Sequence, residues 1–262
     1  MDRYRILCEA CGYPLEDLAR DGRCPECGKP VAESEPDHRA GSPWQQRRSV
    51  RAWFQTSGMA LRRPGQLFDS IAITRRGGTS LLALNAILAG FFVASPWVGT
   101  LIGDPLRRME RGTPLSMLAF VGVLAAEAAA VAGVVIVLTL IEYAGVRFWS
   151  ARRGGRLTPE AAWQVCCHAS IGWLLAGFLP FFGLAFWFFL AANFGVAPRG
   201  WVEYRGSVIS VQTIAYASSY FGGVLAGLLI FESRVYTGVR RCKYAATKRD
   251  PEPATETVAA RI

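Results

Sequence analysis

The chain has 262 residues, of which 52% are hydrophobic, and its formal net charge at pH 7 is +9. Eight Trp and fifteen Phe residues, gathered largely in long apolar blocks, are more than a water-soluble domain of this length buries, so an ordinary soluble globular protein is excluded. The charge is uneven, because residues 1–38 hold five basic and nine acidic side chains, whereas residues 39–76 hold eight Arg and one Asp. We therefore expect an acidic N-terminal part followed by a basic one.

The head, residues 1–36, carries two C-x2-C pairs, Cys8 with Cys11 and Cys24 with Cys27. Thiolates at this spacing can share one tetrahedral Zn²⁺, and the Gly after each pair permits the positive-φ turn of a knuckle. The alternatives are disulfides, disfavoured in a reducing compartment, and a redox motif, disfavoured because two pairs are present. The head is thus predicted to be a small zinc ribbon of β-knuckle type. Four Cys ligands leave no open position for catalysis at the metal.

The acidic charge of the head argues against one common role of zinc ribbons. A negatively charged ribbon repels phosphate, so nucleic acid is not an expected partner. Docking of a protein partner and a purely structural appendage both stay open. No apolar stretch precedes the first Cys, so no signal peptide is expected and the head is predicted to stay in the cytosol.

The collar, residues 37–79, begins with a polar linker and continues with Arg residues mixed with aromatic ones. Such segments are expected to lie at the membrane interface, with aromatic side chains in the bilayer and guanidinium groups toward anionic headgroups. The alternative is a solvated Arg-rich linker that only sets the topology. The candidate ligands of lipid headgroups are Arg47, Arg48, Arg51, Arg62, Arg63, Arg75 and Arg76.

Residues 80–233 contain the long apolar blocks, and about twenty apolar residues cross a bilayer as one helix. The predicted fold is an all-α transmembrane bundle of about four spans, at 81–102, 115–141, 161–193 and 208–231. The third span exceeds one crossing and contains Pro180, so we expect a kink or a break near Leu179–Pro180.

Basic residues predict the orientation of these spans. They are frequent in the loop 142–160 and in the tail, residues 234–262, which is expected to be disordered. The positive-inside rule then places the head, this loop and the tail on the cytosolic side of the cell's inner membrane. Small residues predict helix contacts on two faces: Gly223-x3-Gly227 in the last span, and the stripe Gly122, Ala126, Ala129 and Gly133 in the second.

Glu127 and His168 are the acid and the imidazole that lie deep in the predicted spans, and such groups are candidate functional residues. Helical rise places His168 about 5 Å to the cytosolic side of Glu127, which motivates the hypothesis of a hydrogen bond between them. They are either buried polar groups that orient the bundle or a polar path for a proton or substrate. The chain has no H-E-x-x-H, G-x-S-x-G or Walker motif, so no enzyme is predicted.

The phrases CEACGYPL and RCPECG, between Cys8 and Gly28, resemble the ribbons of bacterial zinc-ribbon multi-pass membrane proteins of unknown function. The phrase RRPGQLFDSI, Arg62–Ile71, is similar to the segment before the helices of the Rab-interacting Yip-type membrane domain family. The resemblance implies a non-catalytic membrane protein that organises partners or bilayer shape.

Two functions from different classes follow from these observations. The leading hypothesis is a membrane scaffold or adaptor in which the zinc ribbon docks a protein partner. The alternative is a small transporter, or a transporter subunit, that uses Glu127 and His168 as a polar waypoint. An intramembrane enzyme ranks third.

Overall fold

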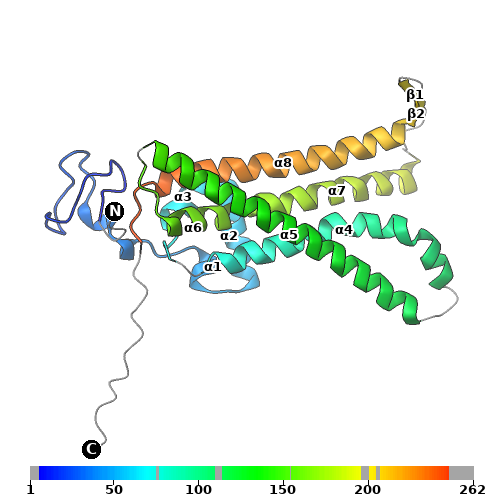
Figure 1. Cartoon of the computed structure of the whole chain (residues 1–262), viewed down its shortest axis with the longest axis horizontal. Coiled ribbons are helices and arrows are strands. Elements are labelled where there is room, and N and C mark those ends of the chain that lie inside the picture. The colour runs from blue at the N-terminus through cyan, green and yellow to red at the C-terminus, as the bar shows by residue number, and fades with distance from the viewer. Residues whose placement is uncertain are drawn as a thin grey trace, which may run out of the picture. The chain divides into compact units, whose positions relative to one another are not determined.

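The computed structural model describes residues 6–74, 77–109, 114–153, 155–195, 201–204 and 207–247. In this part the chain is mostly helical (Figure 1). A short antiparallel hairpin joins β1 (Trp201–Tyr204) to β2 (Ser207–Ser210). The helices are α1 (Pro43–Gln46), α2 (Val50–Arg62), α3 (Pro64–Ser70), α4 (Thr79–Met109), α5 (Pro114–Arg152), α6 (Pro159–Ala169), α7 (Ile171–Phe194) and α8 (Val211–Cys242).

The chain divides into two compact units. Unit 1 contains the described residues up to Thr79, those of Tyr143–Cys166, and those from Thr237 onward. Unit 2 contains Ser80–Glu142 and Cys167–Tyr236. Unit 1 therefore includes the head, the collar and the end of α8, whereas most of the predicted membrane part belongs to unit 2.

Unit 1 is built from short helices whose ends are set by local sequence. At α1, the Ser42 hydroxyl accepts from the Gln45 N–H at 3.2 Å while the Gln45 side chain accepts from the Ser42 N–H at 2.9 Å, which is a capping box. Pro64 lacks an N–H and so begins α3 directly after α2. Phe68 of α3 is fully buried, and a Cβ on Gly238 of α8 would lie 2.8 Å from its ring, so these two helices meet where no side chain intervenes.

Unit 2 is held together by glycines at helix crossings. A Cβ on Gly177 of α7 would lie 2.6 Å from the carbonyl oxygen of Ala89 in α4. Gly223 and Gly227 of α8 face α7, at Pro180 and at the backbone of Ala176. The predicted close approach at Gly223-x3-Gly227 is confirmed. Such contacts replace the hydrophobic driving force that apolar helices lack in lipid.

The predicted contact stripe on α5 is wrong. Gly122 and Gly133 are exposed, and nothing lies within 4 Å of a Cβ on either. The backbone of Ala128 instead meets Gly90 of α4, and Ala132, Val135 and Thr139 are the buried ones among the α5 side chains that the structure describes. Small residues permit a close approach, but which face is used depends on the neighbouring helix.

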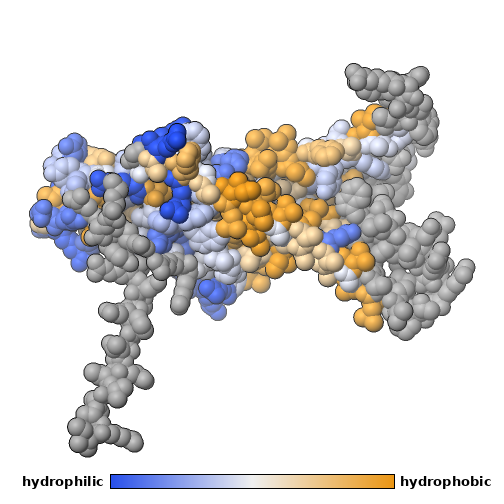
Figure 2. All heavy atoms as spheres, viewed as in Figure 1, coloured by the Kyte–Doolittle hydropathy of each residue, from blue (hydrophilic) through white to orange (hydrophobic). Residues whose placement is uncertain are grey.

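Among the described residues, three stretches are long and apolar enough to cross a membrane: Val121–Arg152, Pro159–Trp187 and Thr213–Cys242. Large apolar side chains are exposed along α5, and Figure 2 shows the hydrophobic surface over this helix. The apolar stretch described in α4, Thr79–Ser95, is shorter. The fourth span, predicted at 81–102, therefore stays a prediction.

The third predicted span is interrupted at Ser170, between α6 and α7, whereas Pro180 lies inside α7. The Ser170 hydroxyl donates to the Cys167 carbonyl at 2.6 Å and accepts from the Asn85 side chain at 2.8 Å. A serine that bonds to the preceding turn competes with the helical ladder. Pro180 is accommodated because its ring packs against Gly223, which has no side chain.

The tail begins as ordered structure rather than as the predicted disordered segment. α8 continues to Cys242, and Ala245, Ala246 and Thr247 are buried. The Thr247 hydroxyl lies 3.2 Å from that of Thr158. The prediction of disorder is therefore wrong for residues 234–247, and the rest of the tail lies outside the described residues.

The glycine contacts of α8 lead to a test. We expect Gly227→Val to destabilise the protein strongly, because its side chain would meet the backbone of Ala176, which cannot move aside as a flexible side chain can. Overpacking of this kind costs about 1–3 kcal/mol or more. Thermal unfolding of the detergent-solubilised protein measures the loss. Gly222→Val is the matched control, since nothing lies within 4 Å of its Cβ position; equal losses would contradict the packing argument.

Candidate metal centre

Each cysteine pair sits on a tight backbone turn. The Gly12 N–H donates to the Cys8 carbonyl at 2.8 Å, and the Gly28 N–H donates to the Cys24 carbonyl at 2.9 Å. Both glycines have positive φ, +82° and +75°. A residue with a Cβ rarely adopts this conformation, so glycine after each pair lets the chain fold back and aims both thiols to the same side.

The two turns are copies of one pattern. The sequence C-x2-C-G-x-P followed by an aliphatic residue occurs at Cys8–Leu15 and again at Cys24–Val31. Each copy closes with an isolated antiparallel bridge rather than a strand, Leu7 with Pro14 and Arg23 with Pro30. Leu15 and Val31, equivalent in the two copies, are buried beside the first cysteine of each pair.

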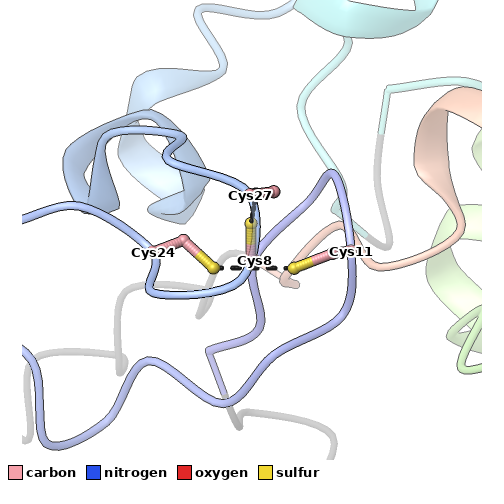
Figure 3. Close-up of side chains that lie close together, drawn as sticks. All are labelled: Cys8, Cys11, Cys24 and Cys27. Carbon is pink, nitrogen blue, oxygen red and sulfur yellow. Dashed lines mark hydrogen bonds between the residues drawn. The ribbon is translucent and has the colours of Figure 1, made fainter.

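The four sulfur atoms lie within 4.8 Å of one another (Figure 3). Two short sulfur–sulfur contacts join different turns: Cys8 Sγ is 3.4 Å from Cys27 Sγ, and Cys11 Sγ is 3.5 Å from Cys24 Sγ. Four thiolates around one zinc ion at about 2.3 Å would be about 3.8 Å apart. A disulfide would need about 2.05 Å. The arrangement fits four ligands of one metal ion.

The thiols of Cys8 and Cys11 have different pKa values, and a bound cation would change both. Desolvation raises the pKa of Cys8, but backbone N–H groups of Cys11 and Ala10 outweigh it and lower that pKa to about 7. Desolvation and hydrogen bonds with the other thiols raise the pKa of Cys11 to about 12. Several thiols crowded together cannot all ionise without a compensating positive charge. A bound divalent cation supplies that charge.

The head is fastened to the rest of unit 1 by a buried arginine. Arg39 is 3% exposed, and its Nε donates to Glu9 Oε1, next to the first thiol, at 2.7 Å. Its Nη1 donates to the Phe68 carbonyl at 2.6 Å, and its Nη2 donates to the Arg241 carbonyl at 3.3 Å. One guanidinium group thus joins the metal-binding loop to the ends of α3 and α8. Its pKa is lowered by burial but raised overall by the Cys242 thiol and the Glu9 carboxylate, so it stays charged.

A second contact ties the first turn to the chain beyond α8. The Tyr244 ring lies 2.8 Å from where a Cβ on Gly12 would stand. Gly28, the equivalent glycine, has nothing within 4 Å of that position. The two copies of the turn therefore have different surroundings: the first is packed and the second faces outward.

Because the two turns have different surroundings, the same substitution at Gly12 and at Gly28 should weaken metal retention to different extents. Gly28→Ala should weaken metal retention only through its positive φ, by about 1–2 kcal/mol. Gly12→Ala should cost more, because the new methyl group meets the Tyr244 ring. Competition with a chelator, on the full-length protein, measures both. The double variant Gly12→Ala/Tyr244→Ala should return the loss to that of Gly28→Ala; an unchanged loss would argue against the contact.

The other predicted site residues do not belong to the cysteine cluster, and Glu127 and His168 are part of unit 2. Glu127 is half-buried on α5, and His168 is buried on α6. The described part of the structure shows no hydrogen bond between Glu127 and His168, so their pairing stays a hypothesis. Five of the candidate headgroup arginines are exposed, namely Arg47, Arg48, Arg51, Arg62 and Arg63, whereas Arg75 and Arg76 lie outside the described residues.

Comparison of the chain with protein families, with curated proteins and with solved structures gives no match. Fold and site define the class instead. Where the structure describes it, the chain is mostly helical, with three helices long and apolar enough to cross a membrane and an N-terminal group of four cysteines that can hold a metal ion. The resemblances to zinc-ribbon membrane proteins and to the Yip-type family are not confirmed.

Proposed function

We propose that the chain is a non-catalytic, multi-pass membrane scaffold or adaptor whose head is a cytosolic zinc ribbon that docks a protein partner. The observation that supports it is the Glu9–Arg39 link, which attaches the four-cysteine cluster to α3 and α8. A docking module must hold a defined position relative to the part that anchors it. A flexible appendage would need no buried ion pair.

Zinc is the metal that this ligand set favours. Four thiolates at tetrahedral spacing select zinc or an iron–sulfur centre, and tandem C-x2-C turns of β-knuckle type are a usual structural zinc site. The cytosol suits such a site because thiols stay reduced there. The basic residues of the loop 142–160 and of the tail support a topology with both termini on that side of the cell's inner membrane.

The chemistry of the exposed head indicates the kind of partner. Five exposed carboxylates, from Glu16, Asp17, Asp21, Glu26 and Glu33, lie in the described part of the head, and Tyr13 of the same head is 37% exposed. An acidic surface and an exposed aromatic side chain match a protein partner with a basic surface. Nucleic acid would be repelled.

The test separates zinc from docking. The full-length protein is purified in detergent from cells, its zinc is counted by mass spectrometry, and co-purifying proteins are identified. Cys11→Ser/Cys27→Ser should lose both zinc and the partner. Glu16→Lys/Asp17→Lys should keep about one zinc per chain and lose the partner. A partner recovered equally with all three proteins would refute the docking role.

A small transporter is the second candidate, and one observation favours it. Glu127 is a half-buried acid on a helix long enough to cross a membrane. Ionisable groups in a membrane are energetically unfavourable, so one that is present is a candidate for function. In reconstituted vesicles Glu127→Gln should then abolish the flux of a proton or substrate while leaving zinc bound. Unchanged vesicle flux would remove this candidate and leave the scaffold untouched.

A further inference from the structure

Helix α2 shows the reverse of the burial pattern of an ordinary surface helix. Its buried residues are small, namely Ala52, Thr56, Ser57 and Ala60. Two of its large apolar side chains point outward instead, since Val50 is 74% exposed and Phe54, one turn further, is 63% exposed, while Trp53, Met59 and Leu61 are half-buried. A helix on the surface of a soluble domain buries its large apolar face. Exposure of the outward face of α2 to water is therefore unfavourable in free energy, and contact with an apolar medium would remove this penalty.

The same helix is flanked by arginines for which the described residues provide no acidic partner. Arg51 and Arg62 lie in α2, Arg47 and Arg48 precede it, and Arg63 follows it. Within the described residues, none of the five forms an ion pair. Elsewhere in unit 1 exposed arginines do pair, as Arg20 does with Glu35 and Arg241 with Asp69. Five exposed guanidinium groups beside an apolar stripe are complementary to an anionic surface that also has an apolar layer.

A groove runs along the C-terminal half of this helix. Its volume is about 550 Å³, and its lining combines apolar and cationic groups. Phe54, Gly58 and Met59 supply the apolar part, while Arg62 and Arg63 supply two guanidinium groups. A phospholipid has a matching arrangement, since its anionic phosphate is joined through glycerol to apolar acyl chains. Guanidinium groups bind phosphate oxygens with charge-assisted hydrogen bonds.

We propose that α2 lies on an anionic lipid bilayer, with Val50 and Phe54 in its apolar layer, and that Arg62 and Arg63 bind the phosphate of one anionic phospholipid in the groove. The occupant is lipid because α3 alone separates α2 from α4, an apolar helix beginning at Thr79. A membrane surface is thus within reach of the chain. The proposal goes beyond the scaffold function, which requires no particular lipid.

Hydrogen exchange of the α2 amides tests this in the full-length protein. The protein is placed in nanodiscs of phosphatidylcholine alone, or of phosphatidylcholine mixed with phosphatidylglycerol. We expect slower exchange in the mixed lipid, by about fivefold for each arginine engaged. Arg62→Gln/Arg63→Gln should lose this difference. Arg20→Gln/Arg23→Gln, which removes the same charge from the head, should keep it.

Two added ligands distinguish lipid from other anions. Inorganic phosphate and a single-stranded RNA are each added to nanodiscs of phosphatidylcholine alone, and neither should slow the exchange. Protection by phosphate would make the groove a site for free phosphate, and protection by RNA would make it a nucleic-acid site; either overturns the proposal. Equal exchange in the two lipid compositions would overturn it as well. Zinc content and partner recovery, measured on the same Arg62→Gln/Arg63→Gln protein, report separately on the scaffold function.

Discussion

Cys24→Ser should remove the metal and unfold the head, while α5, α7 and α8 keep their structure. Cys24 is buried within the small core of the head, where Leu15 and Val31 are buried and Ile6 and Leu18 pack against them. So few apolar side chains cannot offset the conformational entropy of the head, and a structural zinc contributes roughly 10–16 kcal/mol in such domains. Hydrogen exchange of residues 6–38, together with the zinc content, measures this effect.

Cys242→Ser is the matched control for that experiment. Cys242 is also buried, but it lies on α8 and is not one of the four clustered thiols. It should keep about one zinc per chain, and the head should stay protected. If Cys24→Ser retained zinc and slow exchange in the head, the cluster would not be a metal centre. Chelation of the wild-type protein should reproduce the Cys24→Ser pattern.

Arg39→Met should give the second-largest loss, because it leaves the Glu9 carboxylate without the guanidinium group and frees the carbonyls of Phe68 and Arg241. Removing one partner of a buried pair costs about 3–5 kcal/mol. Thermal unfolding should shift accordingly, and the amides at the ends of α3 and α8 should exchange faster.

An exposed ion pair serves as the control for Arg39. Arg20 pairs with Glu35 in the head, and its side chain is 76% exposed. Arg20→Met should therefore cost less than about 1 kcal/mol. The double variant Glu9→Gln/Arg39→Met should recover part of the loss, since the Glu9 side chain then no longer carries a charge that Lys29 alone, at 3.5 Å, has to balance. A loss of equal size for Arg20→Met and Arg39→Met would show that burial of the pair has no special effect.

The cysteine cluster was predictable from sequence because its chemistry is local. Both pairs use the short C-x2-C spacing, and the glycine after each pair marks the turn. The sequence carries a further signal, namely the repeat of the whole pattern at Cys8–Leu15 and Cys24–Val31. That repeat indicates two equivalent turns even before the sulfur positions are known.

Arg39 could not be predicted, because its partners are remote in the chain. It lies in a polar stretch that sequence alone assigns to a linker, yet Phe68 is 29 residues away and Arg241 is 202 residues away. The helix break shows the same limit. Pro180 is the stronger breaker by sequence, but the interruption is at Ser170, where Asn85 of another helix bonds to the hydroxyl. Long-range contacts decided both outcomes.

The position of Arg39 at two helix ends has a mechanical consequence. The carboxyl end of a helix carries partial negative charge, so a buried cation there is attracted along the helix axis as well as to individual carbonyls. Sliding the last turn of α8 by one residue, about 1.5 Å, would lengthen the 3.3 Å contact at Arg241 beyond hydrogen-bond range. Axial displacement of this helix would therefore release the Arg241 carbonyl from Arg39, and with it the hydrogen-bonded connection from α8 to Glu9 beside the first cysteine.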